Sequence, residues 1–288
     1  MKEIVKLIRV NQWVKNFFIF APAFFSGQFY HWPAMANVLL GFFSFCFVAS
    51  AIYVINDYAD IEKDRLHPEK CKRPLASGAI KLPLAFAIGA ILFVSGVAIA
   101  FTVSHWYLGI LLFYFVMNIA YSFRLKQIAI LDITLISVGF LLRVIAGGIL
   151  AGVEVSKWLF LMTFLLSMIL ALAKRRDEFI VLQHRGSLRK SIRGYNLTFI
   201  DISMGFLATV TFVSYMMYTI SEDVVQGFGS DYIYASSFFV LIGLLRYLQL
   251  SFVYRLSGSP TKILYRDKII QLTVVAWIVF FAVVIYWK

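Results

Sequence analysis

The sequence predicts an all-α integral membrane protein, built as a bundle of nine transmembrane helices. Hydrophobic residues make up 61% of the 288 residues, and the mean hydropathy is +0.83. A soluble domain carries about 45–50% apolar residues. The apolar residues gather in nine segments, most of them near the roughly 20 residues that a helix needs to span a bilayer. These segments are residues 17–30, 38–56, 83–103, 106–121, 130–151, 158–173, 197–220, 232–253 and 269–287.

Basic residues are concentrated on one side of this predicted bundle. Of the 27 Lys and Arg residues, 23 lie before the first segment or in the even-numbered connections, and only two lie on the opposite side. By the positive-inside rule, the N-terminus and the even-numbered connections are expected in the cytoplasm and the C-terminus outside the cytoplasmic membrane. The net charge of +12 therefore reflects the orientation of the protein in the membrane, and no nucleic-acid partner is expected.

Residues 1–288 are expected to form a single membrane-embedded domain, in which residues 1–16 lie at the membrane surface. Apolar and basic residues mix through residues 2–12, which is typical of an amphipathic helix at a cytoplasmic interface. The stretch ends with Asn11 and Gln12, and Lys15 follows it. Two amides and a lysine are unusual for a simple anchor, so we expect these three side chains to bind substrate.

An acidic motif comes at the end of the second apolar segment. Residues 56–64 read Asn-Asp-Tyr-Ala-Asp-Ile-Glu-Lys-Asp. The spacing places Asp57, Asp60 and Asp64 within an arc of about 60° on one helical face. Stacked carboxylates repel one another unless a cation holds them, and Mg²⁺ bridges carboxylates to substrate phosphates. The motif predicts a magnesium site, because ionisable residues at a membrane helix end usually serve function; the alternative is a solvated acidic helix end.

The stretch that follows is basic and is interrupted by prolines. Residues 65–78 read Arg-Leu-His-Pro-Glu-Lys-Cys-Lys-Arg-Pro-Leu-Ala-Ser-Gly, and proline breaks helices, so we expect a structured loop. The loop places Arg65, Lys72 and Arg73 beside the aspartates. Cations next to a metal suit a bound diphosphate. The alternative is that each basic residue only contributes to the positive charge that orients the protein in the membrane.

A second polar stretch, Lys174-Arg-Arg-Asp-Glu, opens the sixth connection. Lys174 and Arg175 bring cations, and Asp177 and Glu178 bring carboxylates. This mixture suits a loop that closes over a phosphate or holds a second metal ion. A cap of positive charge on the cytoplasmic side is the alternative.

Polar residues also mark the fourth and fifth segments. Tyr121 and Lys126 lie at the end of the fourth, Asp132 begins the fifth, and Arg143 comes eleven residues later. An arginine at that depth needs a partner or a wet cavity. We expect Tyr121, Lys126 and Arg143 to belong to the site, although a structural ion pair would also explain Arg143.

These motifs together resemble the UbiA-type prenyltransferase superfamily. Residues 56–64 match its first aspartate-rich motif, residues 73–78 match the arginine-proline-glycine segment that follows, and the nine predicted helices fit. The resemblance implies a cavity that faces the cytoplasm and Mg²⁺ as cofactor. It also implies catalytic roles for Arg73, Lys126 and the three aspartates, and a binding role for Asn56.

The sequence departs from most of that superfamily at residues 174–178, where a second aspartate-rich motif is usual. The departure is similar to the polyprenyl-phosphate phosphoribosyltransferase branch. The chain also resembles this branch at residues 12–16, 121–126 and 132–148. The resemblance implies that phosphoribosyl diphosphate is the donor and that a polyprenyl phosphate is the acceptor.

The absence of an evident general base agrees with this interpretation. A lipid phosphate is already an anion at neutral pH, since its second pKa is about 6, and His67 and His184 are isolated in the sequence. One alternative is prenyl transfer to an aromatic or other small acceptor. A second is lipid or ion transport, for which the chain lacks paired interrupted helices.

Overall fold

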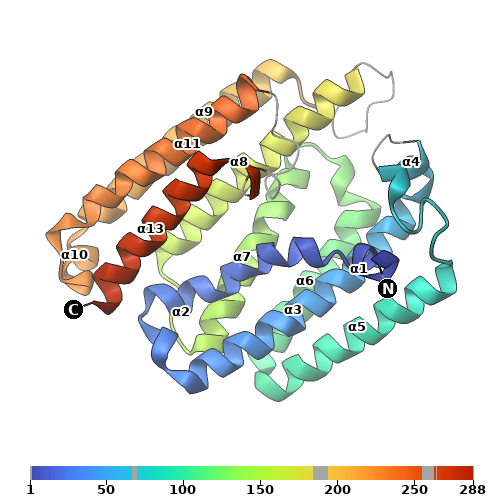
Figure 1. Ribbon diagram of the computed structural model, residues 1–288, viewed down its shortest axis with the longest axis horizontal. Helices are drawn as coiled ribbons and strands as arrows, with labels where there is room; N and C mark the ends of the chain where they lie inside the picture. Colours follow the sequence, from blue (N-terminus) through green and yellow to red (C-terminus); the bar gives the residue numbers. More distant parts are fainter. Residues whose placement is uncertain (1, 67–69, 184–193, 255–262, 264, 288) are drawn as a thin grey trace. The chain divides into compact units, whose positions relative to one another are not determined.

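The computed structural model describes residues 2–66, 70–183, 194–254, 263 and 265–287. Helices account for nearly all of these residues, and no strand occurs among them (Figure 1). The helices are α1 (Lys2–Ile8), η1 (Val10–Phe20), α2 (Ala21–Phe25), η2 (Gln28–Tyr30), α3 (Trp32–Ala59), α4 (Ile61–Arg65), η3 (Lys70–Lys72), α5 (Leu82–Val103), α6 (His105–Phe123), η4 (Leu125–Gln127), α7 (Leu131–Ala151), α8 (Lys157–Gln183), α9 (Leu197–Ile220), α10 (Glu222–Phe228), η6 (Asp231–Ser236), α11 (Ser237–Phe252) and α13 (Lys268–Tyr286).

Within the described residues, eight helical stretches are long and apolar enough to cross a membrane. They are α3, α5, α6, α7, α8, α9, η6 with α11, and α13, and they correspond to the second to ninth predicted segments. The first predicted segment, residues 17–30, instead contains three short pieces, namely the end of η1, α2 and η2. Pro22 at the start of α2 and Gly27, whose φ is 75°, interrupt a regular helix there.

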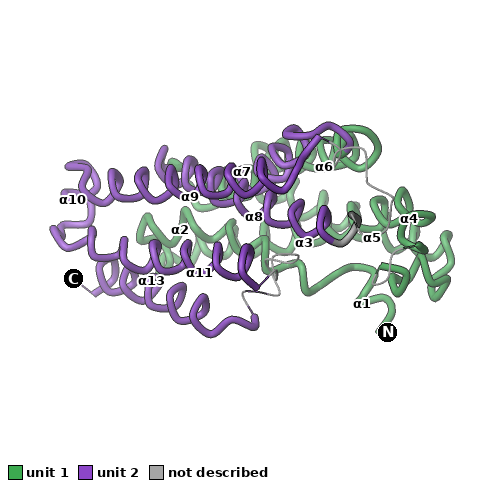
Figure 2. The backbone as a smooth tube through the Cα atoms, turned by 90° about the horizontal axis from the view of Figure 1, so that it is seen from above, with its two compact units in different colours: residues 1–126, 142–155 green, residues 127–141, 156–288 purple. Residues whose placement is uncertain are grey.

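The chain divides into two compact units (Figure 2). Unit 1 contains residues 1–126 and 142–155, and unit 2 contains residues 127–141 and 156–288. Each unit is described separately below.

Unit 1 is built around α3, whose most apolar window is 67% buried. α5 lies along α3, and Ser44 donates a hydrogen bond to the carbonyl oxygen of Gly96 at 2.7 Å. A Cβ atom at Gly96 would lie 2.7 Å from Val48, so only glycine permits this close approach. Tyr107 of α6 donates to the carbonyl oxygen of Gly41 at 2.7 Å. These contacts hold α3 in place, and its last turn carries Asp57.

The N-terminal segment is attached to α3 by a short chain of hydrogen bonds. Trp13 donates from Nε1 to Ser50 Oγ at 3.1 Å, and Ser50 donates to the carbonyl oxygen of Ile8 at 2.7 Å. A Cβ at Gly147 would overlap the carbonyl oxygen of Ile19, so η1 also packs closely on α7. The amphipathic helix predicted for residues 2–12 is α1, which ends at Ile8 before η1 begins.

Unit 2 has a core between α8 and α9 that includes Ile169, Leu172 and Met204. Arg176 links three helices of this unit. Its Nε donates to Asp201 of α9 at 2.7 Å, and its Nη1 donates to the carbonyl oxygen of Ser251 in α11 at 2.8 Å.

The end of α8 differs from the sequence prediction. The sixth apolar segment was expected to end at residue 173 and to lead into a loop, but α8 continues to Gln183. Lys, Arg and Glu are good helix formers, and Arg175 pairs with Glu178 one turn later. Residues 174–178 are therefore helical, and residues 174–183 extend the helix by about 15 Å.

Candidate functional site

The three motif aspartates, Asp57, Asp60 and Asp64, are called the acidic cluster here. Asp57 lies in the last turn of α3, Asp60 lies at a break with φ of −107°, and Asp64 belongs to α4. The sequence predicted one continuous helix for all three, and this is wrong at Asp60. The break is small, because Asp60 N–H still donates to Asn56 O at 3.1 Å and Asp64 N–H to Asp60 O at 2.8 Å.

Two arginines converge on Asp57. Arg9 and Arg73 both donate to its Oδ1, and the Arg73 hydrogen bond measures 3.0 Å. The same Arg73 nitrogen donates to Asp64 Oδ2 at 2.6 Å. The prediction that the loop places Arg73 beside the aspartates is confirmed. Arg9 was assigned only to the membrane surface, and its place three positions before the stretch at residues 12–16 is the one signal that pointed to the site.

Asp60 is bound by Lys126. The Lys126 ammonium lies 2.7 Å from Oδ1 and 2.9 Å from Oδ2 of Asp60. Lys126 comes from η4, and its side chain is 5% exposed. Each carboxylate of the acidic cluster is thus paired with a protein cation, which relieves the repulsion that stacked carboxylates would otherwise suffer.

One oxygen of the acidic cluster fits a metal ion. Asp57 is 2% exposed, and its Oδ2 is buried without a hydrogen-bond partner. Buried polar atoms are nearly always paired, and a bound ion or water is one explanation of an exception. In the described part of the chain, no group of three His, Cys, Asp or Glu side chains lies close enough to hold a metal alone. The magnesium site therefore stays a prediction that the free oxygen of Asp57 supports.

A pocket of about 450 Å³ whose wall mixes basic, amide and apolar groups lies in unit 1, and we call it the cationic pocket. Arg9 and Arg73, which both hold Asp57, are in its wall. The guanidinium of Arg9 also stacks over the Tyr53 ring at 4.8 Å. The lining residues are Val5, Lys6, Arg9, Asn11, Gln12 and Arg73. The structure thus brings the predicted residues Asn11 and Gln12 to the same pocket as Arg73.

Lys15 and Arg143 occupy a more buried part of unit 1. Burial lowers the pKa of Lys15 to about 8, and the nearby charges of Arg143 and Arg9 act in the same direction. Arg143 donates to Asn16 Oδ1 at 2.8 Å and to the Tyr114 hydroxyl at 2.9 Å. Its guanidinium also lies 4.9 Å from the Tyr114 ring centroid. Amide, phenol and aromatic contacts therefore support this buried arginine.

The other predicted residues of unit 1 differ in their surroundings. Asn56 in α3 and Tyr121 in α6 are half-buried, whereas Lys72 in η3 is exposed. Arg65 is exposed and pairs with Glu62 at 2.9 Å. Their predicted binding roles stay predictions. His67 and His184 lie outside the described residues.

Unit 2 contains a second arginine–carboxylate arrangement, the Arg175 network, formed by Asp132, Arg175, Glu178 and Tyr195. Arg175 is 1% exposed; its Nε lies 2.7 Å from Asp132 Oδ2, and its Nη1 pairs with Glu178. Tyr195 donates to Asp132 Oδ1 at 2.7 Å and accepts from the Ile130 N–H at 2.6 Å. Burial raises the pKa of Tyr195, so its hydroxyl remains protonated.

The Arg175 network divides the predicted Lys174-Arg-Arg-Asp-Glu set. Arg175 and Glu178 are engaged with each other, and Asp132 completes the buried pair. Lys174 is exposed and Asp177 is half-buried. The geometry favours a structural role for Arg175 and leaves Lys174 as the cation of this stretch that is accessible to a ligand.

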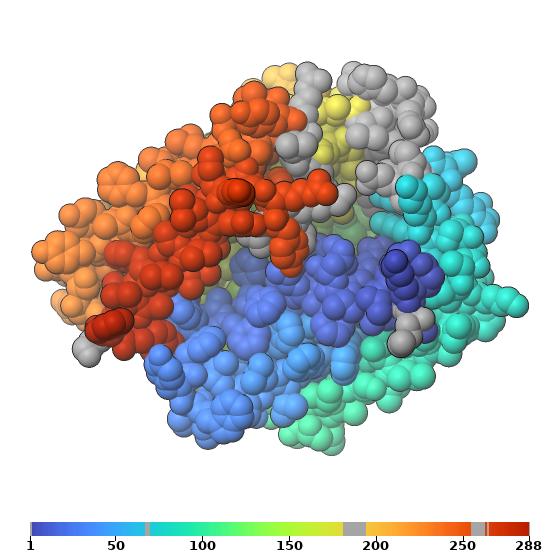
Figure 3. All heavy atoms as spheres, viewed as in Figure 1, coloured from blue at the N-terminus to red at the C-terminus, as the bar shows by residue number. Residues whose placement is uncertain are grey.

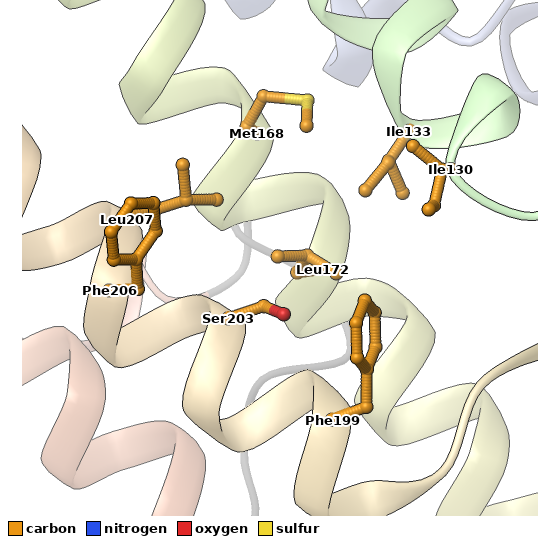
Figure 4. Close-up of a pocket in the computed structure, with 8 residues that line it drawn as sticks. All are labelled: Ile130, Ile133, Met168, Leu172, Phe199, Ser203, Phe206 and Leu207. Atoms are coloured by element: carbon orange, nitrogen blue, oxygen red, sulfur yellow. The ribbon is translucent and has the colours of Figure 1, made fainter.

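Unit 2 also contains an apolar groove of about 180 Å³ between the start of α7, α8 and α9 (Figure 4). Its lining is apolar except for one serine, so the groove suits hydrocarbon rather than phosphate. Two phenylalanines on α9, Phe199 and Phe206, contribute to it. The lining residues are Ile130, Ile133, Met168, Leu172, Phe199, Ser203, Phe206 and Leu207.

Comparison with known proteins identifies the family and the fold of the chain. Residues 17–266 match the UbiA prenyltransferase family. The chain is 31% identical to the decaprenyl-phosphate phosphoribosyltransferase of Mycolicibacterium smegmatis (99% of this chain, 93% of that protein) and 32% identical to that of Mycobacterium tuberculosis (96% and 91%). A UbiA homolog from Archaeoglobus fulgidus, solved bound to GPP and Mg²⁺, superposes with a TM-score of 0.75 at 20% identity, over 98% of this chain and 99% of that one. The chain belongs to the UbiA prenyltransferase family.

Proposed function

We propose that the protein transfers a 5-phosphoribosyl group from phosphoribosyl diphosphate to a polyprenyl phosphate and releases diphosphate. The observation that carries this proposal is the convergence of Arg9 and Arg73 on Asp57 at the wall of the cationic pocket. Two phosphorylated substrates require several cations in one site. The names of the mycobacterial relatives support phosphoribosyl diphosphate as the donor.

The acidic cluster is the proposed magnesium site. Asp57, through its unpaired oxygen, would hold the ion. Asp60 and Asp64 are paired with Lys126 and Arg73 in the structure, so they would join Asp57 as ligands only by turning away from these cations. When bound, Mg²⁺ supplies Lewis-acid neutralisation of the charge on the diphosphate. The Mg²⁺-bound homolog from Archaeoglobus fulgidus supports this choice of ion.

In the proposed reaction, the bond between the anomeric carbon and the diphosphate oxygen breaks, and its electron pair leaves with the diphosphate. A phosphate oxygen of the lipid attacks the anomeric carbon, on which positive charge develops. Arg73 and Lys126 stabilise the leaving charge electrostatically. Because the lipid phosphate is already ionised near pH 7, no side chain has to remove a proton.

The remaining predicted residues have binding roles in this proposal. Lys174 and Asp177 would contact the donor, whereas Arg175 and Glu178 would fix the extended end of α8. The residues proposed to bind substrate in unit 1 are Asn11, Gln12, Lys15, Asn56, Arg65, Lys72, Tyr121 and Arg143.

The proposed setting is the plasma membrane, with nine crossings, a cytoplasmic N-terminus and a cavity open to the cytoplasm. The eight apolar helices and the family place the protein in a membrane. The ninth crossing would be the first segment, which starts in η1, where a 3₁₀ helix rises about 2.0 Å per residue instead of about 1.5 Å. The family match runs through both units, which supports a single transferase domain.

Prenyl transfer to a small acceptor is the second candidate function. It is favoured by the solved homologs bound to the prenyl diphosphates GPP and DMAPP. The stretch Lys174-Arg-Arg-Asp-Glu, in place of a second aspartate-rich motif, argues against it.

The purified protein tests the proposed function directly. It is incubated in detergent with Mg²⁺, radiolabelled phosphoribosyl diphosphate and decaprenyl phosphate, and the label that enters the organic phase is counted. We expect lipid-linked phosphoribose to form and a chelator to prevent it. Failure to label the lipid, together with transfer from a prenyl diphosphate to an aromatic acid in a parallel reaction, would overturn the proposal.

A further inference from the structure

We propose that the cationic pocket binds the phosphate of the lipid acceptor, and that Lys6 and Arg9 are its ligands. This inference rests on the proposed function and assigns one of its two substrates to one pocket. Neither residue was expected at the site from the sequence, which placed both on the membrane surface.

The pocket has the chemistry that a phosphate monoester requires. Lys6 offers a compact positive charge, Arg9 and Arg73 offer planar sets of donors, and Asn11 and Gln12 offer amides. Its volume of about 450 Å³ exceeds that of a phosphate group, so the first part of an attached chain also has space.

Lys6 is available for such a ligand. Its one described ion pair is with Glu3, at 2.6 Å, and the two side chains are 51% and 39% exposed. An exposed pair of this kind contributes little stability. A phosphate dianion therefore competes for Lys6 with only a weak internal partner.

The same segment favours a lipid over a soluble sugar phosphate. Ile4, Val5 and Val10 are 38%, 51% and 37% exposed, and they flank Lys6 and Arg9 in the sequence. The dark blue N-terminal residues form part of the visible surface (Figure 3). An amphiphile matches this pattern, because its phosphate can enter the pocket while its first isoprene units lie against the apolar side chains.

Arg9 connects this pocket to the acidic cluster. It lines the pocket and donates to Asp57. Its φ is 53°, in the left-handed region that few residues other than glycine adopt. Such a conformation persists where the surroundings enforce it, and these positions cluster at functional sites. A lipid phosphate on Arg9 would thus be held close to Asp57, which we propose to hold the metal ion that binds the donor.

Steady-state kinetics on Lys6→Gln test the inference. We expect the KM for decaprenyl phosphate to rise about tenfold, which corresponds to the loss of roughly one charged contact. The KM for phosphoribosyl diphosphate should stay unchanged. A rise in the donor KM instead would assign the pocket to the donor and overturn the inference. Unchanged constants for both substrates would reduce Lys6 to surface charge and overturn it as well.

Two neighbouring substitutions serve as controls. Glu3→Gln removes the partner of Lys6; under our proposal the lipid KM stays the same or falls, whereas a structural role for the ion pair predicts the same loss as in Lys6→Gln. Lys2→Gln removes one exposed charge from the same helix and should change neither constant. A loss in Lys2→Gln equal to that in Lys6→Gln would show a general membrane effect and contradict a specific site.

A binding measurement separates this inference from the proposed function. Geranyl phosphate is titrated into the wild type and Lys6→Gln by calorimetry, with inorganic phosphate and geraniol as comparison ligands. We expect the wild type to bind geranyl phosphate most tightly and Lys6→Gln to bind it about tenfold more weakly. Equal binding by both proteins would overturn the inference even if phosphoribosyl transfer occurs, and absence of that transfer alone would overturn only the proposed function.

Discussion

The acidic cluster of unit 1 and the Arg175 network of unit 2 use the same residue types with different access. Asp57 keeps one buried oxygen without a hydrogen-bond partner, and both of its arginines line a pocket. Asp132 accepts a hydrogen bond from Tyr195 at Oδ1 and forms an ion pair at Oδ2 with Arg175, which is 1% exposed. The difference teaches that an arginine–carboxylate pair becomes a candidate reaction centre when one carboxylate oxygen has no partner and the arginines line a pocket that a ligand can enter.

The largest effect is expected from Asp57→Asn. The change preserves size but removes the charge that we assign to metal binding, so kcat should fall by about 1,000-fold or more. Arg9 and Arg73 are 19% and 25% exposed and remain partly hydrated without their partner, so the melting temperature should change little. Turnover of labelled donor and thermal unfolding in detergent measure the two effects. Activity within tenfold of the wild type would remove Asp57 from the reaction centre.

Arg175→Gln should act on stability instead. The substitution leaves the buried carboxylate of Asp132 and the half-buried carboxylate of Glu178 without their cation, which costs about 3–5 kcal/mol of unfolding free energy. Thermal unfolding of the purified variant measures the loss. Lys174→Gln, at the exposed neighbouring position, is the control and should not shift the transition. An unshifted transition in Arg175→Gln combined with a raised donor KM would make Arg175 a substrate ligand.

Tyr195→Phe should give a smaller loss in the same network. It removes the hydrogen bond to Asp132 and leaves the Ile130 N–H without its hydroxyl acceptor. We expect unfolding free energy to fall by about 1–3 kcal/mol. Tyr232→Phe changes an exposed ring and should have no effect. Equal stability of the Tyr195 variant and the wild type would show that the phenol does not support Asp132.

The smallest effect concerns pH and Lys15. Because its pKa is lowered to about 8, the ammonium is charged below that pH and increasingly neutral above it. Phosphate monoesters are already dianions in this range, since their second pKa is about 6. The KM for a phosphorylated substrate that contacts Lys15 should therefore rise a few-fold between about pH 7 and pH 9. Lys15→Arg keeps its charge and should lose this dependence; persistence of the rise in that variant would exclude Lys15 as its source.

Much of the fold and part of the site followed from the sequence, for physical reasons. Eight predicted apolar segments correspond to long apolar helices, because membrane spans need length and low polarity and both are visible in a sequence. The end of α8 was missed because charged residues mark a membrane boundary without ending a helix. The break at Asp60 was missed because helical periodicity does not reveal a local change in backbone angle.

Within the site, the proximity of Arg73 to the aspartates was predictable, since nine residues separate it from Asp64. Arg9 was not, because its 48-residue separation from Asp57 is closed by the packing of α1 and η1 on α3. Arg175 shows the opposite case. Its type and motif predict a phosphate ligand, and that role stays a prediction, while its ion pairs with Asp132 and Glu178 within unit 2 could not be foreseen from the sequence.

Binding of the donor to two variants tests the comparison most directly. Labelled phosphoribosyl diphosphate is titrated, with Mg²⁺ present, into Asp57→Asn and Arg175→Gln at a temperature at which both are folded. We expect Asp57→Asn to bind about 100-fold more weakly than the wild type, and Arg175→Gln to bind within a few-fold of it. Normal binding by Asp57→Asn, together with loss of binding in Arg175→Gln, would contradict the account and move the reaction centre to unit 2.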